Sequence, residues 1–471
     1  MFHRSDTMKR ALMILLLLLL SVSTIAYSEE ALFPACDKNG KWGYINTQGA
    51  FVIPAQYDSA LAFRGSYAVV SVASGSADQQ GIIDRDGRFV LEPTYTISAG
   101  YNDRLYGGND TGVWLVTRYS DEIWDETEET LLQARREGFF DIPTGTFSGL
   151  HWSRIWPWCS AGRLIPVVND QGEAGYADRT TGKMVIPCRY FASDPSNFFG
   201  GVASVAFRDE AGNATEFFLI GENGETIPLP NSIHGVIYQG AFHDRVMVEN
   251  DEGLFGYADP SGRVIITPQY PKAYAFEQSP YGIAAMVQFL EEDWGFIDQE
   301  GNVLRREIRP FDQAEPNYAN GYCSVKTGEN TFTLFDPMGN AIPITIDGLT
   351  SYAPPMDNGL CRIEAYTAGE AASQSTRRWG FVDLHGNIVA EPLWILPDFA
   401  VFSQDRITVV QLTDGVRKIG YLNSSGEVTI PCIYDKAESF SDGLAYVELE
   451  NRCGYIDLYG NEVFFWERSG E

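Results

Sequence analysis

The chain has 471 residues, of which 13% are aromatic and 46 are glycine, and its formal net charge at pH 7 is −29. So strong a negative charge repels nucleic acid and anionic lipid headgroups, which excludes both as expected partners. Abundant glycine and aromatic residues are typical of short strands joined by tight turns, so an all-β fold is predicted.

The first 28 residues have the features of an export signal. Lys9 and Arg10 precede an unbroken apolar run from Ala11 to Leu20, and Ala26-Tyr27-Ser28 matches a small-residue cleavage site. The apolar stretch is short for a membrane span. We therefore predict that a signal peptide, residues 1–28, is removed, and that the mature chain is secreted, periplasmic or at the cell surface without membrane insertion. An uncleaved N-terminal membrane anchor is the alternative.

A short motif recurs through the rest of the chain about every 39 residues. Eleven starts are recognisable, two of which, at 217–220 and 333–336, have lost the motif glycine. The clearest copies are Lys41-Trp42-Gly43-Tyr44-Ile45-Asn46, Trp294-Gly295-Phe296-Ile297-Asp298 and Trp379-Gly380-Phe381-Val382-Asp383. Such tandem repetition predicts small units that each bury their faces against neighbours.

Each part of the motif has a structural explanation. Apolar side chains on both faces of Trp42-Gly43-Tyr44-Ile45 predict a strand that is covered on both sides. A glycine within a strand indicates close approach of another backbone or ring. The Asp-x-x-Gly that follows, as from Asp84 to Gly87, predicts a hairpin turn. A β-branched run ending in proline, as in Val52-Ile53-Pro54, predicts the end of an edge strand.

Two further segments complete the unit. One is Tyr57-Asp58 followed by Phe63, and the other resembles Gly443-Leu444-Ala445-Tyr446-Val447. Four short segments per unit predict a small antiparallel sheet, and the favoured architecture is a set of β-propeller-like blades. An open β-solenoid array is the alternative, because propellers typically have roughly 4–8 blades and eleven units require two rings or one unusually large ring.

The motif, with its Tyr-Ile-Asn/Asp-x-x-Gly and Val-Ile-Pro, resembles the WG (KWG) repeat proteins of bacteria. The resemblance is strongest at residues 41–70, 255–303, 379–392 and 419–463. It divides the mature chain into WG-type repeats at 29–96 and 173–471, with a degenerate repeat region at 97–172. The resemblance implies an interaction scaffold, and it supplies no catalytic or binding residues. Together with the export signal, this predicts an exported, non-catalytic scaffold that binds a protein or a cell-surface polymer such as a polysaccharide.

The degenerate region contains two departures from the pattern. The first is an insertion at 120–136, for which Ser120 as N-cap, early acidic residues and the final Arg135-Arg136 predict a helix. The second is a concentration of aromatic residues, for which two interpretations remain open: a ligand-binding platform for sugar rings or a peptide, or the core of a degenerate unit. Its residues are Trp114, Trp124, His151, Trp152, Trp156 and Trp158.

The sequence predicts no catalysis, metal or cofactor. Each Asp-x-x-Gly turn offers one carboxylate, whereas calcium requires several oxygen ligands, and the histidines lack zinc-ligand spacing. Acidic residues such as Asp58 and Asp435 recur with the repeat, whereas a catalytic residue should depart from it. A propeller-type glycoside hydrolase or lyase remains the alternative, because carboxylate pairs form in space. The cysteine pair to test for a disulfide is Cys323 and Cys361.

Overall fold

The computed structural model describes residues 31–72, 79–98, 112–119, 123–125, 130–132, 135–156, 162–191, 196–214, 217–233, 235–290, 292–312, 314–356, 358–367, 376–396, 400–413 and 415–467. The ordered elements in these ranges are all β-strands. They include no helix that is long and apolar enough to cross a membrane. The predicted signal peptide, residues 1–28, lies outside them.

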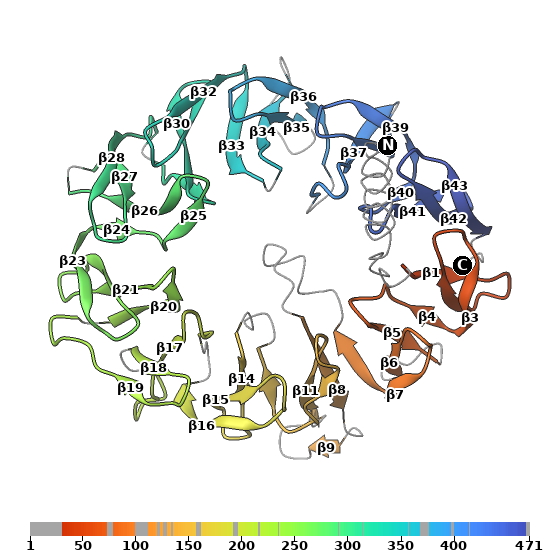
Figure 1. Ribbon diagram of the computed structural model, residues 1–471, viewed down its shortest axis with the longest axis horizontal. Helices are drawn as coiled ribbons and strands as arrows, with labels where there is room; N and C mark the ends of the chain where they lie inside the picture. The colour runs from red at the N-terminus through yellow and green to blue at the C-terminus, as the bar shows by residue number, and fades with distance from the viewer. Residues whose placement is uncertain are drawn as a thin grey trace, which may run out of the picture.

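Apart from one small hairpin, the strands form eleven antiparallel units, named blades 1 to 11 in chain order, which follow one another around a ring (Figure 1). Blades 2 and 3 are hydrogen-bonded to each other through β7 (Phe89–Ser98) and β8 (Val113–Tyr119) and so form one seven-stranded sheet. Blade 1 consists of β1 (Phe33–Cys36), β2 (Trp42–Ile45) and β3 (Phe51–Tyr57); blade 2 of β4 (Ser59–Ala60), β5 (Tyr67–Ser71), β6 (Gln80–Asp84) and β7 (Phe89–Ser98); and blade 3 of β8 (Val113–Tyr119), β11 (Arg135–Asp141) and β12 (Thr146–Phe147). Blade 4 consists of β13 (Arg154–Ile155), β14 (Leu164–Val168), β15 (Glu173–Asp178) and β16 (Met184–Phe191); blade 5 of β17 (Val202–Val205), β18 (Phe218–Gly221) and β19 (Thr226–Ile227); and blade 6 of β20 (Gly235–Phe242), β21 (Arg245–Glu249), β22 (Phe255–Ala258) and β23 (Val264–Tyr270).

Blades 7 to 11 continue in the same order. Blade 7 consists of β24 (Lys272–Ala273), β25 (Glu277–Ser279), β26 (Gly282–Gln288), β27 (Trp294–Ile297) and β28 (Val303–Ile308); and blade 8 of β29 (Asn317–Ala319), β30 (Tyr322–Gly328), β31 (Thr331–Phe335) and β32 (Ala341–Thr345). Blade 9 consists of β33 (Leu349–Pro355), β34 (Cys361–Tyr366), β35 (Arg377–Val382) and β36 (Ile388–Trp394); blade 10 of β37 (Ile407–Thr413), β38 (Val416–Leu422) and β39 (Val428–Tyr434); and blade 11 of β40 (Lys436–Ala437), β41 (Leu444–Leu449), β42 (Arg452–Asp457) and β43 (Glu462–Glu467). Within a blade the chain runs from the centre of the ring outward, as from β33 to β36 in Figure 1.

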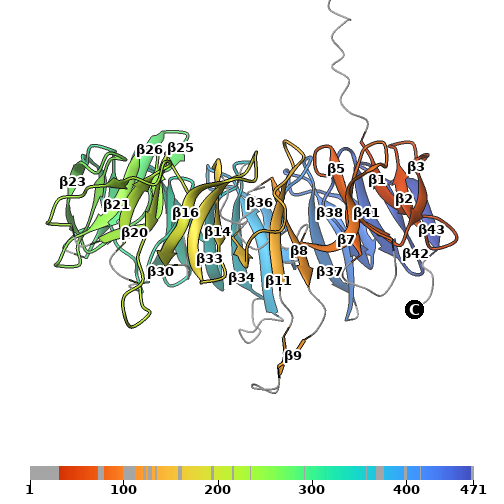
Figure 2. The same ribbon diagram turned by 90° about the horizontal axis from the view of Figure 1, so that it is seen from below.

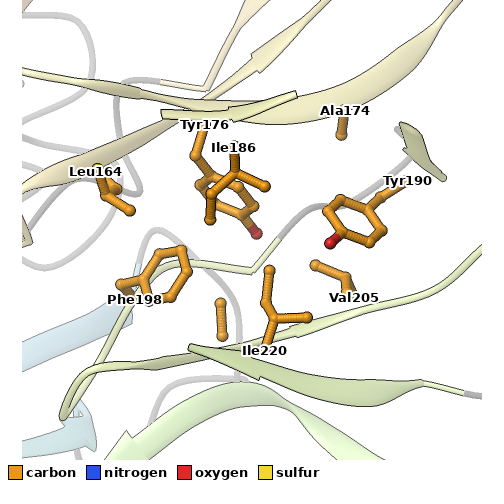
Figure 3. Close-up of a cluster of buried hydrophobic side chains, with 9 residues drawn as sticks. Leu164, Ala174, Tyr176, Ile186, Tyr190, Phe198, Val205 and Ile220 are labelled. Atoms are coloured by element: carbon orange, nitrogen blue, oxygen red, sulfur yellow. The ribbon is translucent and has the colours of Figure 1, made fainter. Parts of the chain in front are cut away.

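Each pair of successive blades encloses its own buried cluster. Between blades 4 and 5, Tyr176 and Ile186 meet Phe198 and Ile220, and all four side chains are buried (Figure 3). Equivalent clusters join every other successive pair. An eleventh cluster joins blade 11 to blade 1 and so closes the ring. The prediction of propeller-like blades is confirmed, and the eleven units form one large ring.

The motif glycine is required by the outermost strand. In blade 1 the ladder between β2 and β3 shifts register at Gly43, and a Cβ on that glycine would lie 2.5 Å from the carbonyl oxygen of Ile53. Gly256 and Gly420 have the same environment, with Ile266 and Ile430 in place of Ile53. The sequence correctly indicated a close backbone approach, which a β-bulge produces.

The position of the proline differs from the prediction. Pro54 lies in the outermost strand, as expected, but β3 continues past it to Tyr57. Because residues 54–56 lie in the bulge, outside the paired register of β2 and β3, a residue without an amide hydrogen fits in mid-strand. The hairpin prediction holds: the Asp84 carboxylate accepts bonds from the amides of Asp86 and Arg88 at 3.0 and 2.9 Å, and Gly87 has a φ of 79°.

The predicted helix at 120–136 is wrong in the described parts of that range. They form β9 (Ile123–Asp125) and β10 (Thr130–Leu132), which pair antiparallel below the ring (Figure 2). The ladder between β8 and β11 runs as far as Tyr119 opposite Arg135. The two ends of the insertion are therefore already antiparallel neighbours, and a hairpin continues their pairing whereas a helix would interrupt it.

Candidate functional site

The candidate site is a pocket of about 320 Å³ at the place where the ring closes, between blades 11, 1 and 2. We call it the closure pocket. Its floor includes Phe33 and Pro34 of β1 together with Tyr455 of β42, and its two side walls are the innermost segments of the neighbouring blades. One wall comprises Ala60, Leu61, Ala62 and Phe63 of blade 2, and the other comprises Lys436, Glu438, Ser439, Ser441 and Asp442 of blade 11.

Aromatic contacts fix the floor of the closure pocket. The rings of Phe33 and Tyr455 lie 5.4 Å apart between centroids, and both side chains are buried. Tyr446 lies beside Tyr455 at 5.9 Å. Burial raises the pKa of Tyr455 and of Tyr446 far above the ordinary tyrosine value, so both phenols stay protonated. They serve as neutral hydrogen-bonding groups on an apolar surface, not as general bases.

The charged groups on the walls are unevenly matched. Lys436 approaches Glu438 at 3.3 Å and Glu448 at 3.7 Å, so the wall lysine is ion-paired. Arg85 donates to the carbonyl oxygen of Gly65 at 2.9 Å. Among the ion pairs of the described residues none includes Asp442. Its carboxylate accepts a hydrogen bond from the Ser441 hydroxyl at 3.3 Å. The closure pocket is thus an apolar, aromatic recess with a carboxylate at its rim, which suits binding.

Two of the four aromatic-platform residues whose side chains are described, Trp114 and Trp152, belong to the core. Trp114 stacks on Phe140 between blades 2 and 3, and Trp152 stacks on Phe139 between blades 3 and 4. Both tryptophans are buried, so neither offers a ring face to a ligand. This agrees with the core interpretation for these two residues, whose strand positions in blades 3 and 4 the degenerate sequence did not reveal.

The other platform residues are not gathered into one surface by the described contacts. His151 is exposed and touches the edge of Trp152, while Trp156 is half-buried with the Arg154 guanidinium 5.1 Å from its ring centre. The side chain of Trp124 and the whole of Trp158 lie outside the described residues. Ligand binding by His151 or Trp156 stays a prediction.

The recurrent carboxylates have structural partners. Asp58 pairs with Lys41 at 2.7 Å, and Asp435 pairs with Lys418 at 2.6 Å in the equivalent place of blade 10. No cluster of metal-ligating side chains occurs in the described ranges. Cys323 and Cys361 carry free thiols and lie in different inter-blade clusters.

One carboxylate departs from the repeat, since Glu137 stands where the three clearest copies have tryptophan and no other copy with the motif glycine has an acidic residue. It is buried and pairs with Arg135, and it accepts a bond from the Ile155 amide at 2.6 Å. Burial raises its pKa in spite of that amide and Arg135. The Glu137 carboxylate thus holds β13 against blade 3 through the Ile155 amide, and its described partners are that amide and the Arg135 guanidinium, with no second carboxylate among them.

Sequence reasoning did not find the closure pocket. The Tyr57-Asp58 segment with Phe63, which forms a wall of the pocket, returns in the sequence only at Tyr434-Asp435 with Phe440, which forms the facing wall. What the motif does not encode is that blade 11 returns to blade 1, and the pocket exists only because of that contact.

The protein is therefore a propeller-like ring of repeated β-sheet blades, with a recess where the ring closes. The family model described as "WG containing repeat" matches residues 42–73, 255–288 and 419–453. The chain therefore carries WG repeats, and the resemblance noted in the sequence is confirmed at these three places.

Three solved structures were found to be similar. A crystal structure of the eukaryotic initiation factor has a TM-score of 0.39 and 11% identity, covering 77% of this chain and 95% of that one. The computationally designed Ika8 protein has 0.33 and 10%, covering 61% and 90%. BamB from Moraxella catarrhalis has 0.31 and 12%, covering 63% and 93%. No curated protein matches.

Proposed function

We propose that this chain is an exported, non-catalytic WG-repeat scaffold that binds a protein at the cell surface through its closure pocket. The observation that carries the proposal is the pocket itself: a recess lined by the aromatic side chains of Phe33 and Tyr455 and by the innermost segments of blades 2 and 11, where the ring closes. Rigid aromatic surfaces of this kind bind polypeptide side chains at a low entropic cost. A surface polysaccharide is the competing ligand.

The test compares peptide and polysaccharide binding by the purified chain. A peptide array and a glycan array are probed with the unaltered chain, with Ser439→Trp and with Ala275→Trp. Ser439 is exposed in the pocket wall, so a tryptophan there fills the recess. Ala275 holds the same position in blade 7, away from the pocket, and is the matched control.

Saturable binding of peptides by the unaltered chain and by Ala275→Trp, with at least about a tenfold loss in Ser439→Trp, is the expected result. Equal binding by all three chains would show that the closure pocket is not the site. Retention on glycans alone would replace the protein ligand with a polymer. Release of reducing sugar from any polysaccharide would overturn the non-catalytic assignment.

A further inference from the structure

A hydrogen bond from the motif tyrosine to the next blade recurs around the ring and has a different acceptor at the closure pocket. In three regular junctions the motif tyrosine of one blade donates its hydroxyl to a carbonyl of the innermost segment of the next blade. Tyr44 bonds Leu61 at 2.9 Å, Tyr257 bonds Tyr274 at 2.7 Å and Tyr421 bonds Glu438 at 2.8 Å. Each acceptor follows its tyrosine by 17 residues.

The same acceptor residues are also held by their own blade. The amides of Leu61, Tyr274 and Glu438 donate to the carbonyl oxygens of Val69, Met286 and Tyr446 at 2.9, 2.9 and 3.0 Å. One residue of the innermost segment is therefore clamped between the two blades, with its N–H bonded to its own blade and its C=O bonded to the preceding one. The clamp holds the segment by backbone groups alone, an amide paired with its own blade and a carbonyl bonded by a tyrosine hydroxyl of the preceding blade, so it does not depend on the side chain of the clamped residue.

Blade 1 makes a different contact at this place. Pro34 is its counterpart of Val69 and Tyr446, because Pro34 pairs with Tyr44 as Val69 pairs with Ile82 and Tyr446 with Tyr455. Tyr455 is the preceding motif tyrosine. Its hydroxyl donates directly to the Pro34 carbonyl at 2.8 Å. In the regular junctions the corresponding hydroxyl and carbonyl both bond the clamped residue that lies between them, whereas here they bond each other.

The closure pocket lies where a clamped segment would run. Its walls are the innermost segments of blades 11 and 2, which flank the same position on either side. Among the described residues β1 is the innermost strand of blade 1. The pocket is also continuous with the buried cluster between blades 11 and 1, so an occupant would extend an interface that already exists.

The regular segments define the chemistry of the occupant. Two residues after the clamped residue comes a phenylalanine, whose ring packs against the same motif tyrosine. Phe63 lies 4.7 Å from Tyr44, Phe276 lies 4.8 Å from Tyr257 and Phe440 lies 4.9 Å from Tyr421. An alanine precedes the clamped residue in each case: the segments are Ala60-Leu61-Ala62-Phe63, Ala273-Tyr274-Ala275-Phe276 and Ala437-Glu438-Ser439-Phe440.

We propose that the closure pocket binds an extended peptide of a partner protein, of the form Ala-x-small-Phe with a basic residue after the phenylalanine, as the innermost strand of blade 1. The peptide phenylalanine packs on the floor that Phe33 and Tyr455 form together. The Tyr455 hydroxyl leaves Pro34 for a peptide carbonyl, and a peptide amide takes its place on the Pro34 oxygen. The basic residue meets Asp442 at the rim, and the chain's net charge of −29 favours its approach. This rests on the proposed function and names its ligand.

The test uses a fluorescent peptide that copies residues 57–66, Tyr-Asp-Ser-Ala-Leu-Ala-Phe-Arg-Gly-Ser, and the full chain. Fluorescence anisotropy should show saturable binding, weakened at least about tenfold when the peptide phenylalanine is replaced by alanine. Tyr455→Phe should weaken binding about fivefold through loss of one hydrogen bond. Tyr421→Phe removes the equivalent hydroxyl at a complete junction and should leave binding unchanged.

Equal binding of the two peptides, or no binding of either, would overturn the proposal, as would equal effects of Tyr455→Phe and Tyr421→Phe. Unfolding temperatures of both variants establish that each is folded. The two proposals can fail separately. If peptides selected on the array need an open pocket, by the Ser439→Trp criterion, but do not need an aromatic residue, the strand assignment falls and the scaffold function stands.

Discussion

Two junctions that share blade 11 differ by a single strand. Between blades 10 and 11, Tyr421 bonds the Glu438 carbonyl and carries the Phe440 ring, so motif and innermost strand lock together. Between blades 11 and 1, Tyr455 bonds Pro34, and Phe33 of β1 supplies the neighbouring ring. The comparison teaches that the motif alone is enough to join two blades, while the innermost strand determines whether a recess remains beside them.

The largest expected effect comes from the motif glycines, which should matter equally in both blades. A Cβ on Gly420 would lie 2.5 Å from the Ile430 oxygen, and on Gly454 it would lie 2.1 Å from the Phe464 oxygen. Gly420→Ala and Gly454→Ala should each lower the free energy of unfolding by about 3 kcal/mol, because backbone must move. Urea denaturation followed by circular dichroism measures this.

Gly235→Ala is the control for that measurement, because a Cβ at Gly235 meets nothing within 4 Å. Its unfolding free energy should stay within about 1 kcal/mol of the unaltered chain. A mild effect of Gly454→Ala beside a severe effect of Gly420→Ala would break the comparison, since blade 11 would then not be built by the same rule as blade 10.

The tyrosine hydroxyls should give a smaller and unequal effect on stability. Tyr421→Phe leaves the Glu438 carbonyl without its donor in a packed junction and should cost about 1 kcal/mol. Tyr455→Phe leaves the Pro34 carbonyl at the floor of a pocket that water can enter, so the cost should be less than about 0.5 kcal/mol. Equal losses in urea denaturation would mean that the closure is as tightly packed as a regular junction.

The smallest effect concerns acid stability and separates the hairpin turns of the two blades. Blade 10 has Asn423 and blade 11 has Asp457 at the same turn position, each accepting two backbone amides. Burial opposes ionisation of Asp457, but hydrogen bonds from Asn461 and Tyr459 outweigh it and lower its pKa. The carboxylate therefore stabilises the fold above its unfolded pKa of about 3.9, and this is lost as pH falls through the lower folded value.

Asp457→Asn should keep the unfolding temperature at pH 7 and reduce the fall in that temperature below about pH 4. Asn423→Asp is the reciprocal variant and should add acid sensitivity to blade 10. Thermal unfolding between pH 2 and pH 7 tests both. An unchanged acid profile in both variants would show that these turns do not contribute to acid unfolding.

The repeated unit could be predicted from the sequence because its residues have local causes. These residues are the glycine opposite the bulge, the aspartate in the turn, and Tyr44 and Ile45, which point to opposite faces of the strand. Each acts within one unit or between adjacent units, so the regular spacing of the motif is enough to identify them. Ring closure could not be predicted in this way. It depends on the angle between successive blades, to which many side chains contribute slightly and no single residue type corresponds.

The wrong helix at the insertion and the two interpretations left open for the aromatic residues have one origin. Favourable end charges predicted a helix at 120–136, but the pairing of Tyr119 with Arg135 across two strands governs its described parts. Trp114 and Trp152 look available in a degenerate sequence, yet each fills a cluster between blades. In both cases a contact made by a neighbouring strand outweighed a local pattern, and such contacts leave no mark within a sequence window.

The prolines of the outermost strands have a consequence beyond the blade. Except for β7, which pairs with β8, the outermost strands of the blades are edge strands, and apolar side chains such as Val52, Ile388 and Val428 are exposed on them. Unprotected edges of this kind pair with other chains and lead to aggregation. The outer strands carry Pro54, Pro187, Pro268, Pro392 and Pro431, each of which lacks an amide hydrogen and, in these blades, lies beside a bulge. The proline and bulge in each of these strands therefore hinder the addition of a strand from another chain.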